Sequence, residues 1–328
     1  MNNYFICFLF LVFFLVEYFY IRLAKKIRIL DTPNERSSHA HLTVRGGGLI
    51  FPFAAIIWCV LLNEYYLFAL GIFILSAISF FDDIKPVHFS IRLFFQVLSL
   101  VLLYVSVHPS PEHIFTIILF MLCGIYFLNM YNFMDGINGI TGAYAIVQSI
   151  SFLIVFIQAD EHIFSQLVLI LIPAILAFLF FNFRKKALTF SGDVGSLSLA
   201  FIFLFIILSF PMEKWYLYAL FSLLYIIDSF FTIIQRILIK EKITQAHRKH
   251  LYQYLANEAG YHHLLPSIIY ASLQLFINIV FIKTQFQSLI VISICVFASV
   301  SYIILKYNVF LNYVRPNFQK SSKKNANQ

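Results

Sequence analysis

The sequence predicts an all-α, polytopic membrane protein, and three observations lead to this fold class. The chain of 328 residues is 61% hydrophobic and only 12% charged, with a mean hydropathy of +0.85. Apolar runs of about 20 residues, long enough to cross a hydrocarbon core of about 30 Å, recur along its whole length. Basic residues are concentrated in alternate connections between these runs. We therefore expect one integral-membrane domain over residues 1–305 and a basic cytoplasmic tail over residues 306–328.

Eleven apolar runs are candidate membrane spans. They lie at residues 3–21, 47–63, 65–81, 91–107, 113–129, 139–158, 163–181, 194–210, 215–235, 264–282 and 286–305. The first run lacks a basic segment before it and a small-residue cleavage site after it, so we interpret it as a helix rather than a signal peptide. Because eleven is odd, the two termini are expected on opposite sides of the membrane.

The distribution of Lys and Arg predicts the orientation. Of the 23 basic residues, 21 lie in residues 22–46, 82–92, 130–138, 182–193, 236–263 and 306–328. The opposite connections hold only Lys214 and Lys283. The positive-inside rule therefore predicts that the N-terminus is outside and the C-terminus is in the cytoplasm. About 11 transmembrane helices are expected between them. Chemistry is expected on the cytoplasmic face, because the outside connections are short and hold no dense polar cluster.

The first cytoplasmic connection combines glycines with arginines. It reads Asp31-Thr-Pro-Asn-Glu-Arg36-Ser-Ser-His and continues to Arg45-Gly-Gly-Gly48. Glycines permit close backbone approach, and the forked guanidinium groups of Arg36 and Arg45 suit phosphate. Taken alone, this segment is equally compatible with a solvated juxtamembrane loop.

The second connection begins with the adjacent carboxylates Asp82 and Asp83. Two neighbouring carboxylates at a membrane boundary repel each other unless a cation offsets their charge. Mg²⁺ suits the pair, because it takes one or two carboxylates and shares its remaining shell with water and substrate phosphates. The alternative is a solvated Asp-Asp turn at a helix end.

The third connection places polar side chains at three-residue intervals: Asn129, Asn132, Asp135 and Asn138. On a helix, residues i and i+3 are neighbours, so at least the first three are expected to line one face of a polar cavity. A carboxylate at membrane depth costs about 2.5–3.5 kcal/mol on insertion scales, which favours a functional explanation. The alternative is a capping and turn cluster.

Two further carboxylates lie at or within apolar runs. Asp193 stands in Gly192-Asp-Val-Gly195-Ser at the start of the eighth run, where an ordinary helix N-cap is the alternative. Asp228 lies well inside the ninth run and requires a partner or a cavity.

The last polar connection contains His247-Arg248-Lys249-His250. Such a basic patch can hold a diphosphate, and histidine can donate to a base or a phosphate. The alternative is a simple orientation determinant. Acids for a metal, cations for phosphate and amides for a sugar therefore lie on one face, which predicts metal-assisted phosphoryl transfer at the membrane surface.

Together these five motifs, within residues 31–256, resemble those of the polyprenyl-phosphate N-acetylhexosamine-1-phosphate transferases. This superfamily includes phospho-MurNAc-pentapeptide translocase and the undecaprenyl-phosphate GlcNAc-1-phosphate transferases, and the last motif is most similar to the branch that starts O-antigen. The resemblance implies a multi-pass enzyme of the bacterial cytoplasmic (inner) membrane with a cytoplasmic active site. It also implies transfer of a sugar 1-phosphate from a UDP-N-acetylhexosamine to undecaprenyl phosphate, which releases UMP and starts a lipid-linked surface glycan.

Residue chemistry and the resemblance together predict roles for individual residues. The catalytic residues are Asp82, Asp83 and Asp135; Mg²⁺, with Mn²⁺ as an alternative ion, is held by Asp193 and Asp83; and substrates are bound by Arg36, Arg45, Asn129, Asn132, Asn138, His247, Arg248 and His250. Three departures stand out. Asn138 occupies a position where many members have Asp, the late motif lacks the compact His-x-His-His form, and Leu42 and Val44 stand where Pro is common.

Two mechanisms and two other functions are left open by the sequence. The lipid phosphate attacks the β-phosphorus of the UDP-sugar directly, assisted by Asp82 or Asp83, or the reaction passes through an aspartyl-phosphate. A secondary transporter and an inactive membrane scaffold are the rival functions, although a transporter places ionisable groups near the midplane. Membrane lipid is an expected partner and nucleic acid is not. The amino sugar, the lipid length and the oligomeric state stay open.

Overall fold

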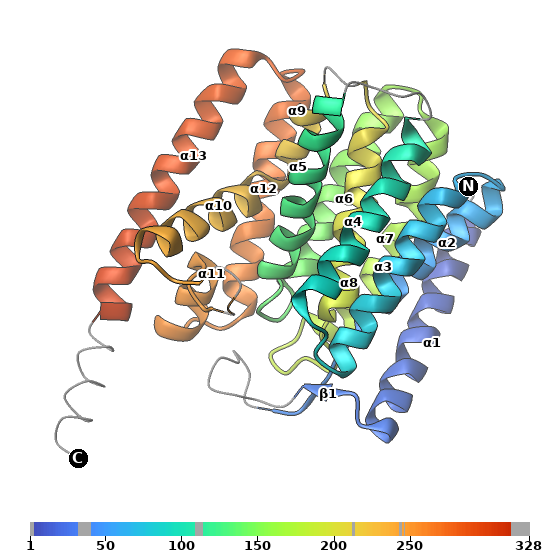
Figure 1. Ribbon diagram of the computed structural model, residues 1–328, viewed down its shortest axis with the longest axis horizontal. Coiled ribbons are helices and arrows are strands. Elements are labelled where there is room, and N and C mark those ends of the chain that lie inside the picture. Colours follow the sequence, from blue (N-terminus) through green and yellow to red (C-terminus); the bar gives the residue numbers. More distant parts are fainter. Residues whose placement is uncertain are drawn as a thin grey trace.

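The fold is almost entirely helical. The computed structural model describes residues 3–31, 41–108, 114–211, 214–242, 245 and 247–315, and the statements below concern these residues. One short antiparallel pair, β1 (Leu30–Asp31) with β2 (Thr43–Val44), is the only sheet in this part of the chain. The predicted all-α class is confirmed (Figure 1).

The helices follow the predicted apolar runs in order. They are α1 (Asn3–Ile27), η1 (Gly47–Leu49), α2 (Ile50–Leu62), α3 (Tyr66–Ile84), α4 (Phe89–Val107), α5 (Ile114–Phe133), α6 (Ile140–Gln158), α7 (His162–Asn182), α8 (Gly192–Leu208), α9 (Trp215–Ala219), η2 (Leu220–Ser222), α10 (Leu223–Leu238), α11 (Leu251–Gln253), η3 (Tyr254–Glu258), α12 (Leu264–Lys283), α13 (Ser288–Val309) and η4 (Phe310–Val314).

Nine helical stretches of the described chain are long and apolar enough to cross a membrane. Two shorter apolar stretches, residues 47–62 and 192–208, correspond to the second and eighth predicted runs. The protein is therefore a multi-pass membrane protein, whereas the number of spans and their orientation in the cell stay predictions. The last helix continues through η4 to Val314, beyond the predicted boundary at residue 305.

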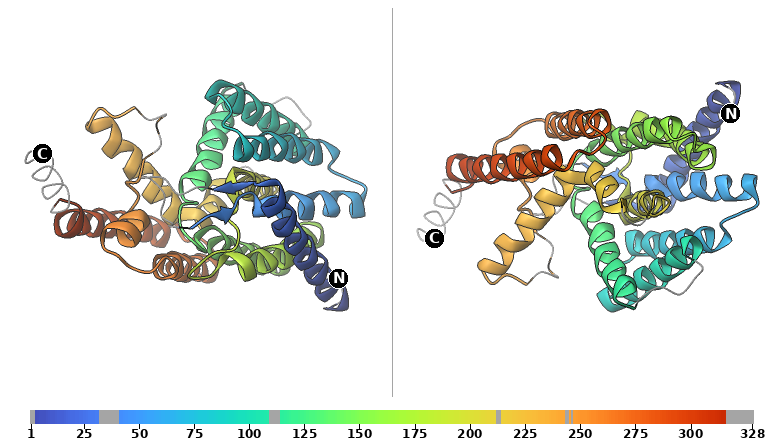
Figure 2. Two further views of the ribbon diagram at one scale, coloured as in Figure 1. Left: turned by 90° about the horizontal axis from the view of Figure 1, so that it is seen from below. Right: turned by 90° about the horizontal axis from the view of Figure 1, so that it is seen from above.

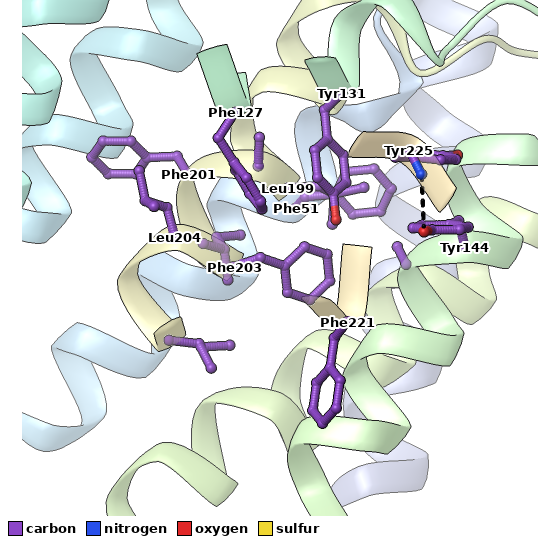
Figure 3. Packing of buried hydrophobic residues seen from close by; sticks show 14 of the residues in the cluster. Phe51, Phe127, Tyr131, Tyr144, Leu199, Phe201, Phe203, Leu204, Phe221 and Tyr225 are labelled. Carbon is purple, nitrogen blue, oxygen red and sulfur yellow. Dashed lines mark hydrogen bonds between the residues drawn. The ribbon is translucent and has the colours of Figure 1, made fainter. Parts of the chain in front are cut away.

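Helix α8 lies in the middle of the bundle (Figure 2). Every residue from Val194 to Leu208 is buried, and the helix packs against α2, α3, α4 and α5. A helix that is apolar on all sides can face either lipid or other helices, and here neighbouring helices enclose it. Its phenylalanines meet rings from neighbouring helices; the Phe68 and Phe205 centroids are 4.0 Å apart. Figure 3 shows this packing around Phe201 and Phe203.

The ninth predicted run is not one continuous helix. It divides into α9, the short 3₁₀ turn η2 and α10, which runs obliquely to its neighbours (Figure 1). The side-chain amides of Gln148 and Gln274 donate to the carbonyls of Phe221 (3.3 Å) and Leu220 (3.1 Å) at this break. Irregular backbone inside a membrane needs such internal partners, so α6 and α12 stabilise the break.

The connections that carry the polar motifs gather at one end of the bundle, which also holds β1, β2 and α11 (Figure 1; Figure 2, left). The start of α1 and the end of α13 lie at opposite ends of the bundle (Figure 1). The outer faces are apolar; on α13, for example, Leu289 is 78% and Phe297 75% exposed. These faces suit contact with lipid, whereas the polar end is where the bundle can meet water.

Candidate active site

A cavity of about 330 Å³ opens at the polar end of the bundle. Four of the five sequence motifs contribute to its wall through Asp31, Arg45, Asn132, Asp135, Gly136, Asn138, Gly192, Asp193, His247 and Arg248. Gln253 and His263 complete it and were not expected from the sequence, although His263 lies in a His-His pair just before the tenth run. Arg36 lies outside the described residues.

Asp83, at the end of α3, holds the start of α8. Its Oδ1 and Oδ2 accept the backbone N–H groups of Asp193 (2.9 Å) and Val194 (3.1 Å). Its fully buried side chain also lies 3.1 Å from Nε of Arg45. An anion is favourable at a helix N-terminus, where backbone N–H groups lack partners. Gly192 has φ +71°, and a Cβ there would collide with the Asp83 carboxylate, so this position requires glycine.

The two glycine-containing motifs pack directly against each other. The N–H groups of Gly47 and Gly48 donate to the carbonyls of Phe190 (2.9 Å) and Ser191 (3.0 Å). A Cβ on Gly48 would collide with the Cα of Gly195, so only glycine allows this approach. The contact places the neighbouring Arg45 beside the start of α8. Burial lowers the pKa of Arg45, but the nearby carboxylates, led by Asp83, raise it by more, so the guanidinium stays charged.

Asp82 and Asp193 converge on one guanidinium. Nη1 of Arg92, near the start of α4, lies 2.8 Å from Oδ2 of Asp82 and 3.4 Å from Oδ2 of Asp193. Asp82 also accepts the backbone N–H of Val87 (2.6 Å). Arg92 was not among the predicted site residues; its position in a basic cytoplasmic connection, ten residues after Asp82, was the one available signal.

Asp135 lies beyond the end of α5. The expected helical face therefore includes Asn129 and Asn132 but not Asp135, because the chain leaves the helix after Phe133, before the Asp-Gly pair that disfavours helix. The Asp135 carboxylate accepts the hydroxyls of Thr141 (2.5 Å) and Ser191. Burial raises its pKa, although these two hydroxyls oppose the shift.

The three asparagines have different surroundings. Nδ2 of Asn129 donates to Gln96 (3.1 Å) and to the carbonyl of Ile125 (2.8 Å). Asn132 lines the cavity of about 330 Å³ and also a small one, of about 20 Å³, beside Arg92. Nδ2 of Asn138 donates instead to the carbonyls of Arg184 (2.9 Å) and Lys185 (3.3 Å). The Asn138 side chain thus holds the connection between α7 and α8.

The late basic motif, residues 247–250, contributes to the cavity wall in two layers. His247 and Arg248 line the cavity, whereas His250 is only 1% exposed beneath them. The ring centroids of His247 and His250 are 4.9 Å apart. Burial, followed by the nearby side chains of His250 and Arg236, lowers the pKa of His247 to about 3. Nδ1 of His250 lies 2.9 Å from Oδ1 of Asp228, so the carboxylate inside the ninth run has a partner.

The donor set fits a hard divalent cation. In the described parts of the chain, no three His, Cys, Asp or Glu side chains converge on one metal-sized position. Mg²⁺ does not need three, because one or two carboxylates suffice when water and phosphate supply the remaining oxygens. The carboxylates of Asp82 and Asp193 approach a common point and offer only oxygen, as Mg²⁺ and Mn²⁺ require.

Comparisons with known proteins agree with the motifs. The model of the family described as Glycosyl transferase family 4 matches residues 65–210, which include Asp82, Asp83, Asp135 and Asp193. The chain is 24% identical over 278 residues to the probable undecaprenyl-phosphate N-acetylglucosaminyl 1-phosphate transferase of Bacillus subtilis (strain 168), covering 76% of this chain and 75% of that protein.

Two phospho-N-acetylmuramoyl-pentapeptide-transferases are also similar. The protein of Dictyoglomus turgidum is 27% identical over 212 residues, covering 58% of this chain and 68% of its own length. That of Streptococcus uberis is 36% identical over 93 residues, covering 28% and 27%. Residues 65–210 of the chain are thus similar to glycosyl transferase family 4, and the names of these two kinds of relative agree with that similarity.

Proposed function

We propose that the protein transfers N-acetylhexosamine 1-phosphate from a UDP-N-acetylhexosamine to undecaprenyl phosphate, releases UMP and so starts a lipid-linked surface glycan. The coarser part, a sugar-1-phosphate transferase that uses a polyprenyl phosphate, is supported by the names of the relatives. The late basic motif is the basis for the finer proposal of O-antigen or a similar lipopolysaccharide. We place the enzyme in the bacterial cytoplasmic membrane with its cavity facing the cytoplasm, in agreement with the bias of Lys and Arg.

One observation carries this proposal: three carboxylates and two guanidiniums meet beside a cavity at the end of an apolar bundle. A polyprenyl phosphate has its chain in the bilayer and its phosphate at the surface, whereas a UDP-sugar arrives from water. A site at the ends of membrane helices is reached by both. Because both substrates are anionic, Arg45, Arg92 and Arg248 are suited to reduce the repulsion between their phosphates.

In the reaction we propose, a phosphate oxygen of the lipid attacks the β-phosphorus of the UDP-sugar, and the bond from that phosphorus to UMP breaks. Mg²⁺ held by Asp82 and Asp193 would neutralise charge on the departing UMP. Of the adjacent pair, Asp82 is the better candidate to take a proton from the lipid phosphate, because its side chain is 10% exposed whereas that of Asp83 is 0% exposed. Both oxygens of Asp83 accept backbone N–H groups, so its role is to fix α8, and through it Asp193.

The observation that favoured the transporter alternative has a structural explanation. Asp228 was the ionisable residue inside an apolar run, and the structure surrounds it with partners: His250, Tyr270 (2.5 Å) and Tyr302 (2.9 Å). A carboxylate with its oxygens occupied in this way is a structural anchor rather than a transport site.

The test is transfer of label by the purified protein in detergent, supplied with undecaprenyl phosphate, Mg²⁺ and a panel of radiolabelled UDP-sugars. We expect label in the lipid fraction with at least one UDP-N-acetylhexosamine and an equal amount of UMP. Asp193→Asn should lower the rate about 100-fold. Lys283→Gln, at the other end of the bundle, should leave it unchanged. No labelled lipid with any of these donors would refute the proposal.

A second measurement separates the two mechanisms. Labelled UMP is incubated with the protein and the UDP-sugar in the absence of lipid phosphate. Direct attack predicts no exchange of label into the UDP-sugar, because no bond to UMP breaks without the acceptor. Exchange at a rate comparable with transfer would instead establish a covalent intermediate.

A further inference from the structure

Arg92 occupies the point where two carboxylates from different helices converge. Its Nη1 bonds Asp82 at the end of α3 and approaches Asp193 at the start of α8, at 2.8 and 3.4 Å. The three side chains are largely shielded from water: 35% of Arg92, 10% of Asp82 and 15% of Asp193 is exposed. Charge interactions are strong in such surroundings, because water screens them little.

Few other bonds hold the guanidinium in place. Within the described residues, Asp82 and Asp193 are its only hydrogen-bond partners, and its buried Nε has none. The small cavity beside Arg92 holds little more than one water molecule. Asn132 and Asp193 line both this cavity and the one of about 330 Å³, which Arg92 itself does not line. Arg92 is thus held chiefly by the two carboxylates.

The acidic groups at this point outnumber the basic ones. Three carboxyl groups, those of Asp82, Asp83 and Asp193, face two guanidiniums, those of Arg45 and Arg92. A divalent cation would add positive charge here, and it would need the same carboxylate oxygens that Arg92 now binds, at about 2.0–2.1 Å.

We propose that Arg92 is a resident counter-ion that competes with the divalent cation for Asp82 and Asp193. Binding of the cation displaces the guanidinium, because two cations cannot share one point between two carboxylates. Once released from the carboxylates, the guanidinium has its forked donors free for a phosphate oxygen of a substrate. The competition follows from the described contacts, and only the final contact with substrate rests on the proposed function.

The test measures binding of Mn²⁺ to the purified protein without nucleotide or lipid, by the paramagnetic resonance signal of free Mn²⁺. Arg92→Gln should bind Mn²⁺ about tenfold more tightly than the wild type, because a competing charged hydrogen bond is removed. Lys85→Gln is the matched control. It removes the same charge from the exposed cap of α3 without a contact to either carboxylate, and should change the affinity less than about twofold.

Two further results complete the test. Arg92→Lys keeps the charge with fewer donors and should give an intermediate affinity. In the unaltered protein, Mn²⁺ should increase modification of Arg92 by phenylglyoxal, measured by mass spectrometry, and this readout does not depend on the folding of a variant. The proposal is overturned if Arg92→Gln binds Mn²⁺ no more tightly than Lys85→Gln, or if Mn²⁺ leaves Arg92 equally or less reactive. Neither assay contains a sugar donor, so a protein without transferase activity would still answer both.

Discussion

Asp228 and His250 form a buried pair that joins α10 to the late basic motif. Oδ1 of Asp228 lies 2.9 Å from Nδ1 of His250, and their side chains are 0% and 2% exposed. The hydroxyls of Tyr270 and Tyr302 and the backbone N–H of Leu251 also donate to this carboxylate. The pair thus fixes the layer beneath His247, so a charge inside an apolar run supports one wall of the cavity.

Replacing Asp228 with Asn should destabilise the protein and reduce transfer together. Loss of the negative charge leaves the buried Lys306 without a nearby counter-ion and His250 without its carboxylate partner, and breaking a buried pair costs about 3–5 kcal/mol. We expect a clearly lower Tm in detergent and at least a tenfold lower rate. Tyr270→Phe is the control, because it removes one hydrogen bond worth about 1 kcal/mol. Equal Tm values for the two variants would argue against the buried pair.

Gly192→Ala should abolish transfer by displacing Asp83 from the start of α8. Gly192 and Gly260 both have left-handed φ angles, +71° and +73°, so alanine costs each about 1 kcal/mol of backbone strain. A Cβ at Gly192 also collides with the Asp83 carboxylate, whereas a Cβ at Gly260 meets no atom within 4 Å. The transfer rates of Gly192→Ala and Gly260→Ala are measured in parallel. Because both variants carry the backbone strain, the difference between their rates reports the effect of the collision with Asp83. Comparable rates would show that Asp83 tolerates displacement.

Asn138→Asp should destabilise the protein rather than create a metal ligand. Nδ2 of Asn138 donates to two backbone carbonyls, and an aspartate there would place a carboxylate oxygen against both. The loss of two donors in a buried position costs about 1–3 kcal/mol, with charge repulsion in addition. We expect Tm to fall further in Asn138→Asp than in Asn138→Ala, with the concentration of Mg²⁺ for half-maximal rate unchanged. A lower requirement for Mg²⁺ in Asn138→Asp would contradict this.

His247 should make the protein less stable as the pH falls from neutral. Its folded-state pKa is about 3, whereas the unfolded chain has a His pKa of about 6.5 and therefore takes up the proton first. The stability contributed by neutral His247 is complete above about pH 6.5 and declines as the pH falls toward the folded pKa.

The measurement is Tm in detergent between pH 7.5 and 5, for the wild type and for His247→Gln. The wild type should lose more stability over this range. Asp135, whose pKa is raised, contributes a slope of opposite sign, but it is present in both proteins and cancels in the difference. Parallel curves for the two proteins would show that His247 titrates normally.

Much of the architecture could be predicted because it depends on local composition. Each apolar run became helical since a membrane-spanning segment must bond its own backbone internally. The break at η2 could not be predicted in this way. It is stabilised by Gln148 and Gln274, which come from helices distant in sequence.

The sequence by itself determined which residue types gather at one end of a helical bundle, because hydropathy and the bias of Lys and Arg are properties of each segment alone. Only the tertiary structure decided their partners. Asp83 caps a helix 110 residues away, Asp193 approaches Arg92 across 101 residues, and the Asn138 amide donates to backbone carbonyls of residues 184 and 185. The physical reason is that a hydrogen bond or an ion pair depends on distances of about 3 Å, which are set by how helices pack.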